Sequence, residues 1–328
     1  MIFLNANNTK LMKNRKKNIL LQALIIIALM IVLGFTGSYY TYKKHYQIKV
    51  KNSVQLQELL SYTGKRLPIV SAHRGGTSKN YPENCIETFE NTLKHTYAII
   101  ECDPRYTRDS AIVLHHDPVL QRTTNGDGAV NNFTLNELKQ FLLKDAGGDI
   151  TDFKIPTLNE ALEWAKGKTI LVLDQKDVPP AVRLKIAEEH NALCNVIIIV
   201  YSFEDAKLCY KLNKNVMMEV MIPSIDMALE FEKTGVPWKN VIAFVGHVIP
   251  ENKELYAFLH NKGVLCMAGS SRNVDRRYLT NNVSDYSTLK GEYQEFFKKG
   301  IDLIETDLPR ELGTLLFKGQ KIKNKYLN

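Results

Sequence analysis

Two histidines and three acidic residues follow apolar runs at positions where they could act on one substrate. His73 comes directly after the run 67–72, and Glu101 and Asp103 follow the run 97–100. Because strand side chains alternate between faces, two carboxylates two residues apart enter the same cavity. His116 and Asp174 follow later apolar residues in the same way. Carboxylate oxygens are ligands for hard cations, so the three acidic residues predict a site for one divalent cation, Mg²⁺ or Ca²⁺.

The basic residues nearest to these groups suit an anionic ligand. Arg74 can hold phosphate oxygens with a planar fork, Lys176 can hold them as a point charge, and the Gly75-Gly76 pair lets backbone come close. Imidazole titrates near neutral pH, so His73 and His116 can supply a general base and a general acid. A cation on the phosphoryl oxygens, an acid on the leaving oxygen and a base on the attacking one are what phosphodiester hydrolysis needs. We expect His116 to be the acid, but the order of the two histidines along the chain leaves the reverse assignment open.

Other interpretations of the same region stay open at this stage. The two carboxylates after the second apolar run could form an ion pair with Arg105, which shares their face. Glu219, at the end of a later run, could replace Asp174 as the third cation ligand. We interpret His115 as structural, because neighbouring strand residues cannot both face inward, and His247 as lining or structure.

Eight strand-like runs alternate with helix-like runs along the chain. The strand-like runs are 67–72, 99–103, 169–174, 195–200, 215–221, 241–245, 264–267 and 303–306, and the helix-like ones include 158–165, 181–192, 203–212, 225–233, 251–261 and 289–299. This alternation predicts an α/β fold around a parallel sheet. A length of 328 residues suffices for one (β/α)₈ barrel of about 250 residues and an appendage. In such a barrel the active site lies at the carboxyl ends of the strands, so the candidate residues share one mouth.

Two longer excursions interrupt the alternation on the mouth side. Residues 118–153 follow the second strand and are polar and glycine-bearing, with a helix-like stretch at 135–143. We interpret them as a small inserted subdomain, with a surface loop as the alternative. Residues 270–287 carry three arginines and two tyrosines, which would suit either a substrate lining or lid, or an ordinary solvated loop.

Several motifs in a fixed order resemble the glycerophosphodiester phosphodiesterase family over about residues 67–309. They are His73-Arg74-Gly75, Pro82-Glu83-Asn84, Glu101-Cys102-Asp103, Thr107-Arg108-Asp109, His116-Asp117, Arg122-Thr123-Thr124 and Thr306-Asp307-Leu308-Pro309. Separate motifs in a set order are much more specific than one short pattern. The sequence departs from the family pattern at Asp174-Gln175-Lys176, where E-x-K is usual, and at Cys266-Met267-Ala268, where a Trp is common.

The resemblance implies a TIM barrel, a divalent cation and hydrolysis of a small glycerophosphodiester to an alcohol and glycerol 3-phosphate. It also implies that a glycerol hydroxyl of the substrate attacks first, giving a cyclic phosphate that water then opens. Two alternatives remain: a phospholipase-type phosphodiesterase that acts on intact lipid head groups, and a non-catalytic barrel that binds phosphorylated ligands. The sequence does not indicate the preferred head group or the oligomeric state.

The amino-terminal segment carries a pattern typical of a membrane anchor. Residues 1–17 form a basic tail, and residues 18–38 are almost all apolar. At about 1.5 Å per helical residue such a segment nearly spans a hydrocarbon core of ~30 Å. We expect a single transmembrane helix at 18–38, a stalk at 39–65, the phosphodiesterase barrel at 66–320 and a carboxyl-terminal tail at 321–328. By analogy with a signal anchor, the catalytic domain would be extracytoplasmic.

The distribution of charge argues against a nucleic-acid partner. The whole chain has a formal charge of +8, but residues 1–57 hold nine of the 43 Lys and Arg and none of the 35 Asp and Glu. The remaining 34 basic and 35 acidic residues give a net charge of −1. The basic excess therefore belongs to the amino-terminal segment, and the globular part lacks the charge that DNA or RNA binding requires.

Overall fold

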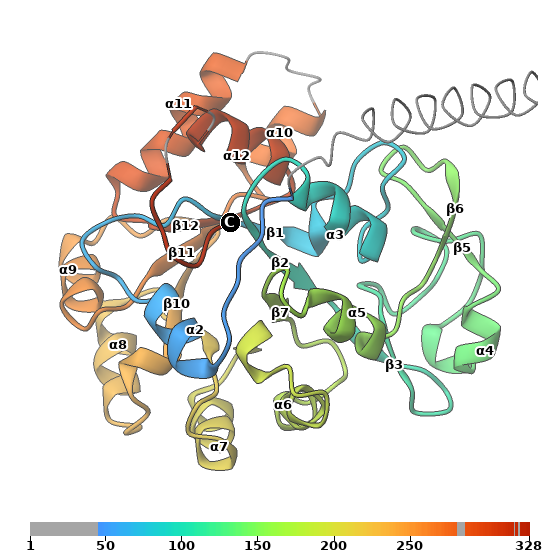
Figure 1. Ribbon diagram of the computed structural model, residues 1–328, viewed down its shortest axis with the longest axis horizontal. Helices are drawn as coiled ribbons and strands as arrows, with labels where there is room; N and C mark the ends of the chain where they lie inside the picture. The colour runs from blue at the N-terminus through green and yellow to red at the C-terminus, as the bar shows by residue number, and fades with distance from the viewer. Residues whose placement is uncertain (1–44, 281–285, 318, 321) are drawn as a thin grey trace, which may run out of the picture. The chain divides into compact units, whose positions relative to one another are not determined.

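Eight parallel strands close into a barrel in the computed structural model (Figure 1). The structure describes residues 45–280, 286–317, 319–320 and 322–328. In chain order the barrel strands are β1 (Val70–Ala72), β2 (Ala98–Cys102), β7 (Leu171–Leu173), β8 (Val196–Val200), β9 (Met218–Met221), β10 (Val241–Gly246), β11 (Cys266–Gly269) and β12 (Leu303–Thr306). β1 pairs with both β2 and β12, which completes the ring. Each barrel strand falls on one of the eight predicted runs.

Helices follow the barrel strands and surround them in Figure 1. They are α3 (Ile86–Leu93), α5 (Leu158–Ala165), α6 (Pro180–Glu189), α7 (Phe203–Leu212), α8 (Ile225–Glu232), α9 (Lys253–Asn261), α10 (Val274–Thr280), α11 (Tyr286–Lys298) and α12 (Pro309–Phe317). Side-chain caps set several of their starts, as at Thr157, which forms a capping box with Glu160. The predicted (β/α)₈ architecture is confirmed, and residues 270–287 contribute one extra helix, α10, before α11.

The amino-terminal end of the barrel is filled by apolar side chains and covered by a helix that precedes β1. Ile99, Ile197 and Ile242 lie inside the barrel and belong to one core cluster with residues from α2 (Ser53–Leu59). Layers of branched side chains of this kind make the interior of a small barrel a packed core rather than a pore. The open end for a ligand is therefore the opposite one, where the strands end.

Residues 45–65 cover the barrel end, where we expected a stalk. Ile48 is 0% exposed, its backbone N–H donates to Lys168, and it forms a β-bridge with Leu327. The predicted carboxyl-terminal tail packs in the same place, since Tyr326 is buried and its carbonyl accepts from Lys49. The physical reason is that the apolar floor of the barrel would otherwise face water. The expected boundaries at 65 and 321 thus differ from the structure, in which both segments are part of the barrel unit.

The insertion after β2 has its own small core. It contains the hairpin of β3 (Pro104–Tyr106) and β4 (Ile112–Leu114), helix α4 (Leu135–Leu138), and the hairpin of β5 (Leu142–Lys144) and β6 (Ile150–Lys154). Its buried residues pack against Cys85, which precedes α3, and they are Val113, Leu120, Val130, Leu138, Leu143 and Ile155. The excursion is therefore a packed unit that extends the predicted range 118–153 back to residue 104.

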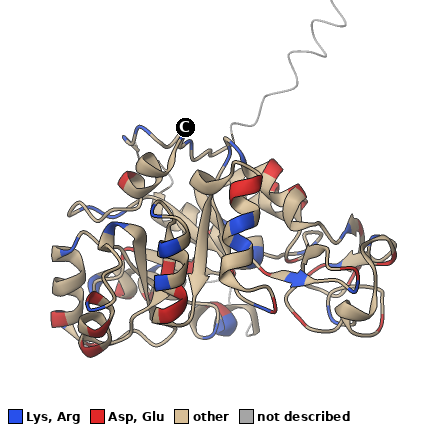
Figure 2. Cartoon of the chain, turned by 90° about the horizontal axis from the view of Figure 1, so that it is seen from below, with Lys and Arg blue, Asp and Glu red and all other residues tan. Residues whose placement is uncertain are grey.

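The predicted anchor, 18–38, lies outside the described residues. Among the residues that are described, no helix has both the length and the apolar character needed to cross a membrane. Figure 2 shows basic and acidic residues interspersed over the helices of the described part.

Candidate active site

A pocket of about 530 Å³ opens where the barrel strands end. Six of the seven predicted site residues line it: His73, Arg74, Glu101, His116, Asp174 and Lys176. The seventh, Asp103, is 1% exposed and contacts both Arg74 and Lys176. The barrel thus brings together residues up to a hundred positions apart, as its topology predicts.

The turn after β1 (His73–Gly75) points its side chains and one N–H group at the site. Arg74 has a left-handed backbone with φ 50°, and its N–H donates to Glu101 Oε2 at 2.7 Å. A Cβ atom on Gly75 would lie 2.3 Å from Phe89, and one on Gly76 would lie 2.2 Å from Pro309. The glycines are therefore required by positive φ and by packing against Phe89 and Pro309, whereas we expected them to make room for the ligand.

Three carboxylates form a compact group at the ends of β2 and β7. One oxygen from each of Glu101, Asp103 and Asp174 lies within 4.8 Å of the others. Asn84 fixes Asp103 from both sides: its Nδ2 donates to Oδ2 at 2.6 Å, and its Oδ1 accepts from the Asp103 N–H at 2.9 Å. Glu219 is not part of this group, so the geometry favours Asp174 as the third oxygen donor.

The electrostatics of the three carboxylates call for positive charge. Burial and the nearby Asp103 raise the pKa of Glu101. Burial acts the same way on Asp103, but Lys176, His116 and Arg74 outweigh it and lower the pKa of Asp103. The Lys176 ammonium lies 3.0 Å from Asp103 and is also paired with Asp174, although we predicted it to bind phosphate. Three clustered carboxylates, all of them hard oxygen donors, are met by the half-buried Lys176 and by Arg74 at 3.8 Å from Asp103, and their donor set fits a divalent cation.

Each predicted catalytic histidine is held by a carboxylate. His73 Nδ1–H donates to Asp307 at 2.6 Å, and His116 Nδ1–H donates to Asp117 at 2.7 Å. Fixing Nδ1 sets the tautomer and leaves Nε2 of each ring for proton transfer. Asp307 and Asp117 belong to motifs of the family pattern, but their spacing in the sequence does not indicate this role.

The environments of the two histidines move their pKa values apart. Burial by itself lowers the pKa of His73, but the hydrogen bond to Asp307 and the charge of Glu305 outweigh it and raise the pKa. Burial also lowers the pKa of His116, and Asp103 and Asp117 offset only part of that effect. His73 therefore holds a proton more readily than His116.

The alternative roles of two neighbouring residues are resolved by their contacts. Arg105 pairs with Asp177 at 3.1 Å and donates to the carbonyls of His115 and His116, so it supports the loop that carries His116. His115 uses both ring nitrogens, on the carbonyl of Asp117 and on Thr123. Its predicted structural role is therefore in agreement with the geometry, and Arg105 does not pair with the carboxylate group.

Two further buried acids hold this site in place, and sequence reasoning gave neither a role. Glu83 binds Arg74 through two contacts of 3.2 Å and Arg122 through two of 2.7 and 2.8 Å, and Arg122 continues to Asp117. The sequence offered one indication of this network. Glu83 and Arg122 both belong to motifs of the family pattern, Pro82-Glu83-Asn84 and Arg122-Thr123-Thr124.

Asp275, the second of these acids, lies on α10 and is fully buried beneath Asp307. It accepts from Ser270, Tyr293 and Thr306 side chains at 2.6 to 2.8 Å and from the Asp307 N–H at 2.8 Å. The backbone that carries the partner of His73 is thus tied to α10. No motif marks Asp275 in the sequence.

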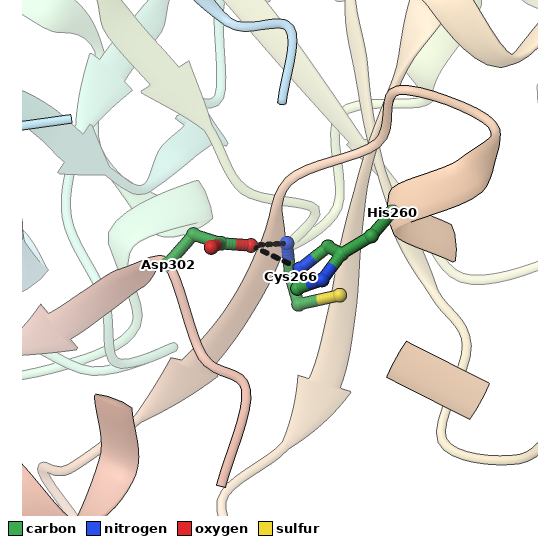
Figure 3. A group of neighbouring side chains, drawn as sticks. All are labelled: His260, Cys266 and Asp302. Atoms are coloured by element: carbon green, nitrogen blue, oxygen red, sulfur yellow. Dashed lines mark hydrogen bonds and ion pairs between the residues drawn. The ribbon is translucent and has the colours of Figure 1, made fainter. Parts of the chain in front are cut away.

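A second group of possible ligands lies at the opposite end of the barrel, where β11 and β12 begin. Figure 3 shows His260, Cys266 and Asp302 pointing toward one another. Asp302 accepts from His260 Nε2 at 2.9 Å and from the Cys266 N–H at 2.8 Å, and burial raises the pKa of the Cys266 thiol. The ring of Tyr62 stacks on His260 at 3.7 Å. These groups satisfy one another and fasten the segment before β1 to the barrel floor.

Comparison with known proteins adds an independent line of evidence. The model of the glycerophosphoryl diester phosphodiesterase family matches residues 73–264. A glycerophosphodiester phosphodiesterase of Caldanaerobacter subterraneus subsp. tengcongensis is 30% identical over 266 residues, which cover 76% of this chain and 98% of that protein.

Solved structures give the same result. The crystal structure of a glycerophosphoryl diester phosphodiesterase from Parabacteroides distasonis superimposes with a TM-score of 0.80 at 38% identity, covering 87% of this chain and 99% of the other. An Oleispira antarctica phosphodiesterase, solved in complex with the product sn-glycerol-3-phosphate, shares the fold at 20% identity, with a TM-score of 0.57 and coverage of 76% and 96%.

Proposed function

Since the chain belongs to the glycerophosphoryl diester phosphodiesterase family, a family of phosphoric diester hydrolases, we propose that it hydrolyses glycerophosphodiesters to an alcohol and glycerol 3-phosphate with one divalent cation and two histidines. The observation that carries this proposal is the pair of carboxylate-bound imidazoles, His73 and His116, in one pocket with three clustered carboxylates. The product agrees with the ligand named for the Oleispira antarctica structure.

The cation would be held by Glu101, Asp103 and Asp174. When bound, a divalent cation draws electron density from the phosphoryl oxygens and so favours attack on phosphorus. Either Mg²⁺ or Ca²⁺ suits three carboxylates. Arg74, whose side chain lies between Glu83 and Asp103, keeps its charge at any working pH and can orient the phosphate through its remaining N–H groups.

Proton transfer falls to the two histidines. In the first step one imidazole takes the proton of a glycerol hydroxyl, whose oxygen bonds to phosphorus, while the other donates a proton to the departing alkoxide as its P–O bond breaks. The cyclic phosphate that results is opened by water with the two roles exchanged, so both rings return to their starting states. Asp307 and Asp117 hold the rings and stabilise whichever imidazolium is present.

The pKa directions favour one assignment of the two roles. His73, with its raised pKa, arrives protonated and suits the acid, whereas His116, with its lowered pKa, arrives neutral and suits the base. This order is the reverse of the one that we expected from the sequence. The leaving group would then lie on the side of His73.

The two alternatives from the sequence, action on intact lipid head groups and a non-catalytic barrel, gain no support from the comparisons. A direct test measures release of choline from glycerophosphocholine and from phosphatidylcholine, with and without excess EDTA. We expect release from the first substrate alone and its loss in EDTA, restored by added Mg²⁺ or Ca²⁺. Undiminished activity in excess EDTA would refute the cation, and faster release from phosphatidylcholine would refute the substrate class.

A further inference from the structure

The pocket has two chemically different halves. The half around β1, β2 and β7 carries the histidines, the clustered carboxylates, Arg74 and Lys176. The other half is formed by β8, β9 and β10 and is mainly apolar, with Ile199, Tyr201, Glu219, Met221 and Phe244 on its wall. Since phosphate chemistry occupies the first half, the second must accommodate one of the two organic groups that a phosphodiester carries.

Glu219 places a buried carboxyl group in the apolar half of the pocket. It lines the pocket, is 4% exposed, and its Oε2 atom has no hydrogen-bond partner among the described residues. In the strand register its neighbours are Ile199 on β8 and Ile242 on β10, which offer nothing polar. A buried carboxyl group without a partner costs stability unless a ligand satisfies it.

Glu219 takes part in neither cation binding nor proton transfer, the two functions already assigned to the site. It is not among the three carboxylates that cluster for the cation, and each catalytic histidine has another carboxylate partner. Burial, followed by the charges of Glu305 and Asp174, raises the pKa of Glu219. Without a bound cation this favours the neutral carboxylic acid, and a cation bound beside Glu219 would lower the pKa and so pair with the ionised form.

We propose, resting on the proposed function, that the apolar half is a head-group subsite for cationic alcohols such as choline and ethanolamine, with Glu219 as the residue that selects them. A methylated ammonium group combines an apolar surface with a positive charge. Ile199, Met221 and Phe244 match the surface, and the carboxyl group of Glu219 matches the charge. An aromatic side chain such as Phe244 adds favourable contact with a desolvated cation.

The charges around the subsite oppose other head groups. Glu305 and Asp174 also line the pocket, so an anionic head group would meet several carboxylates. The guanidinium of Arg272 lines the outer part of the pocket, but this residue is exposed and its charge is screened by water. A neutral head group would fill the same space but would not favour ionisation of Glu219, so it would gain no ion pair there.

The test compares two substrates that differ in charge alone. Glycerophosphocholine and its carbon isostere, the glycerophosphodiester of 3,3-dimethylbutanol, have the same shape. We expect the wild type to have a kcat/KM about tenfold higher on the choline substrate, in line with the ~1–2 kcal/mol of a desolvated cation contact. Glu219→Gln should reduce this ratio to about one, and Phe244→Leu should reduce it in part.

Three outcomes would overturn the subsite. A wild-type ratio near one would do so, as would an unchanged ratio in Glu219→Gln. Equal losses on both substrates in that variant would place the shared glycerol, not the head group, against Glu219. If Glu219→Gln does not fold, Phe244→Leu and Glu219→Asp decide the matter by the same ratio.

A binding measurement separates failure of the subsite from failure of the proposed function. Calorimetric titration of the wild type with each compound in EDTA reports affinity without hydrolysis. If neither compound is hydrolysed, the proposed function fails, and tighter binding of the choline compound still supports the subsite. Equal binding of both compounds would overturn it.

Discussion

The two imidazoles of the candidate active site have similar bonds, but their pKa values are shifted in opposite directions. Both donate Nδ1–H to a carboxylate, both lie near Arg74, and each has a second acid nearby, Glu305 for His73 and Asp103 for His116. Only His116 also lies near Lys176, which lowers its pKa further. An unperturbed histidine has a pKa of about 6.5. Raising one value and lowering the other lets the protonated His73 and the neutral His116 coexist near neutral pH. The proposed mechanism then needs no rare protonation state of either histidine at its start.

Removing each histidine should therefore have a different effect on different leaving groups. His73→Ala should slow glycerophosphocholine hydrolysis by about 10²–10⁴ yet spare much of the rate on a p-nitrophenyl phosphodiester, because p-nitrophenolate leaves without a proton. His116→Ala should slow both, since the attacking hydroxyl needs a base whatever leaves. Steady-state kinetics on the two substrates check this. The opposite pattern would restore the order that we expected from the sequence.

The pH dependence of kcat/KM should show the same two groups. Activity should fall below pH 6.5 as His116 gains a proton, at its lowered pKa, and above pH 6.5 as His73 loses one, at its raised pKa. Asp307→Asn removes the carboxylate that raises the pKa of His73, so the alkaline limb should move to lower pH. An unmoved alkaline limb in this variant would separate that limb from His73.

Asp103 is the carboxylate whose loss should be most damaging to cation binding. Asp103→Asn removes one of three oxygen donors that lie within 4.8 Å of one another. We expect loss of activity and of the stabilisation that Mg²⁺ or Ca²⁺ gives to thermal unfolding, with the barrel still folded by circular dichroism. Asp152→Asn, on the exposed strand β6, is the matched control and should behave as the wild type. Full activity of the Asp103 variant would contradict the assignment.

At the scale of elements, α10 serves as a support for the end of β12. Asp275 accepts four hydrogen bonds, three from side chains and one from the Asp307 N–H. All of its donors come from β11, β12 and α11 or the residues that follow them. Helix α10, in the loop after β11, therefore sets the position of Asp307, whose carboxylate holds His73.

Asp275→Asn should loosen this support. The amide places N–H groups opposite N–H and O–H donors, so we expect a loss of about 1–3 kcal/mol in unfolding free energy together with a lower kcat. Tyr293→Phe, which removes only one of the four bonds, should cost about 1 kcal/mol and change kcat little. Urea unfolding and steady-state kinetics on both variants check this. A variant at Asp275 with normal kcat would show that Asp307 is positioned without α10.

The sequence was sufficient for the strands because each is a short buried run with apolar side chains on both faces, which parallel barrels require. It was sufficient to place six of the seven predicted site residues at the carboxyl ends of the barrel strands, because these six lie at or just after those runs, whereas His116 follows β4 of the insertion. It did not reveal Asp275 or the contact of Asp307 with His73. Residues after the ends of β12 and β1 meet only when the barrel closes, and no sequence spacing indicates that contact. The sequence also did not indicate that α2, which lies in the predicted stalk, covers the barrel floor.

At the scale of the whole molecule, the two ends of the described chain close the bottom of the barrel together. Gln47 and Asn328 exchange two backbone hydrogen bonds, and Ile48 lies fully buried beside them. This arrangement places the functional boundary of the catalytic unit at about residue 45, upstream of the boundary at 66 that the sequence indicated.

A chain that begins at His45 should fold and keep full activity, because it retains every contact of the barrel floor. A chain that begins at Lys51 lacks Ile48 and the bonds of residues 46–49, and should lose about 2–5 kcal/mol of stability, as for truncation of a buried isoleucine. Thermal unfolding and glycerophosphocholine hydrolysis of the two chains check this. Equal stability of both would show that residues 45–50 contribute nothing to the barrel.

The bond between His73 and Asp307 joins residues 234 positions apart, and this has a consequence for the order of events during synthesis. The ribosome completes His73, the clustered carboxylates and His116 long before the last strand exists. Until β12 emerges and closes on β1, His73 lacks the carboxylate that fixes its tautomer and holds its proton. We therefore expect a nascent chain to be inactive for most of its elongation and to become active in one step, when β12 closes the barrel.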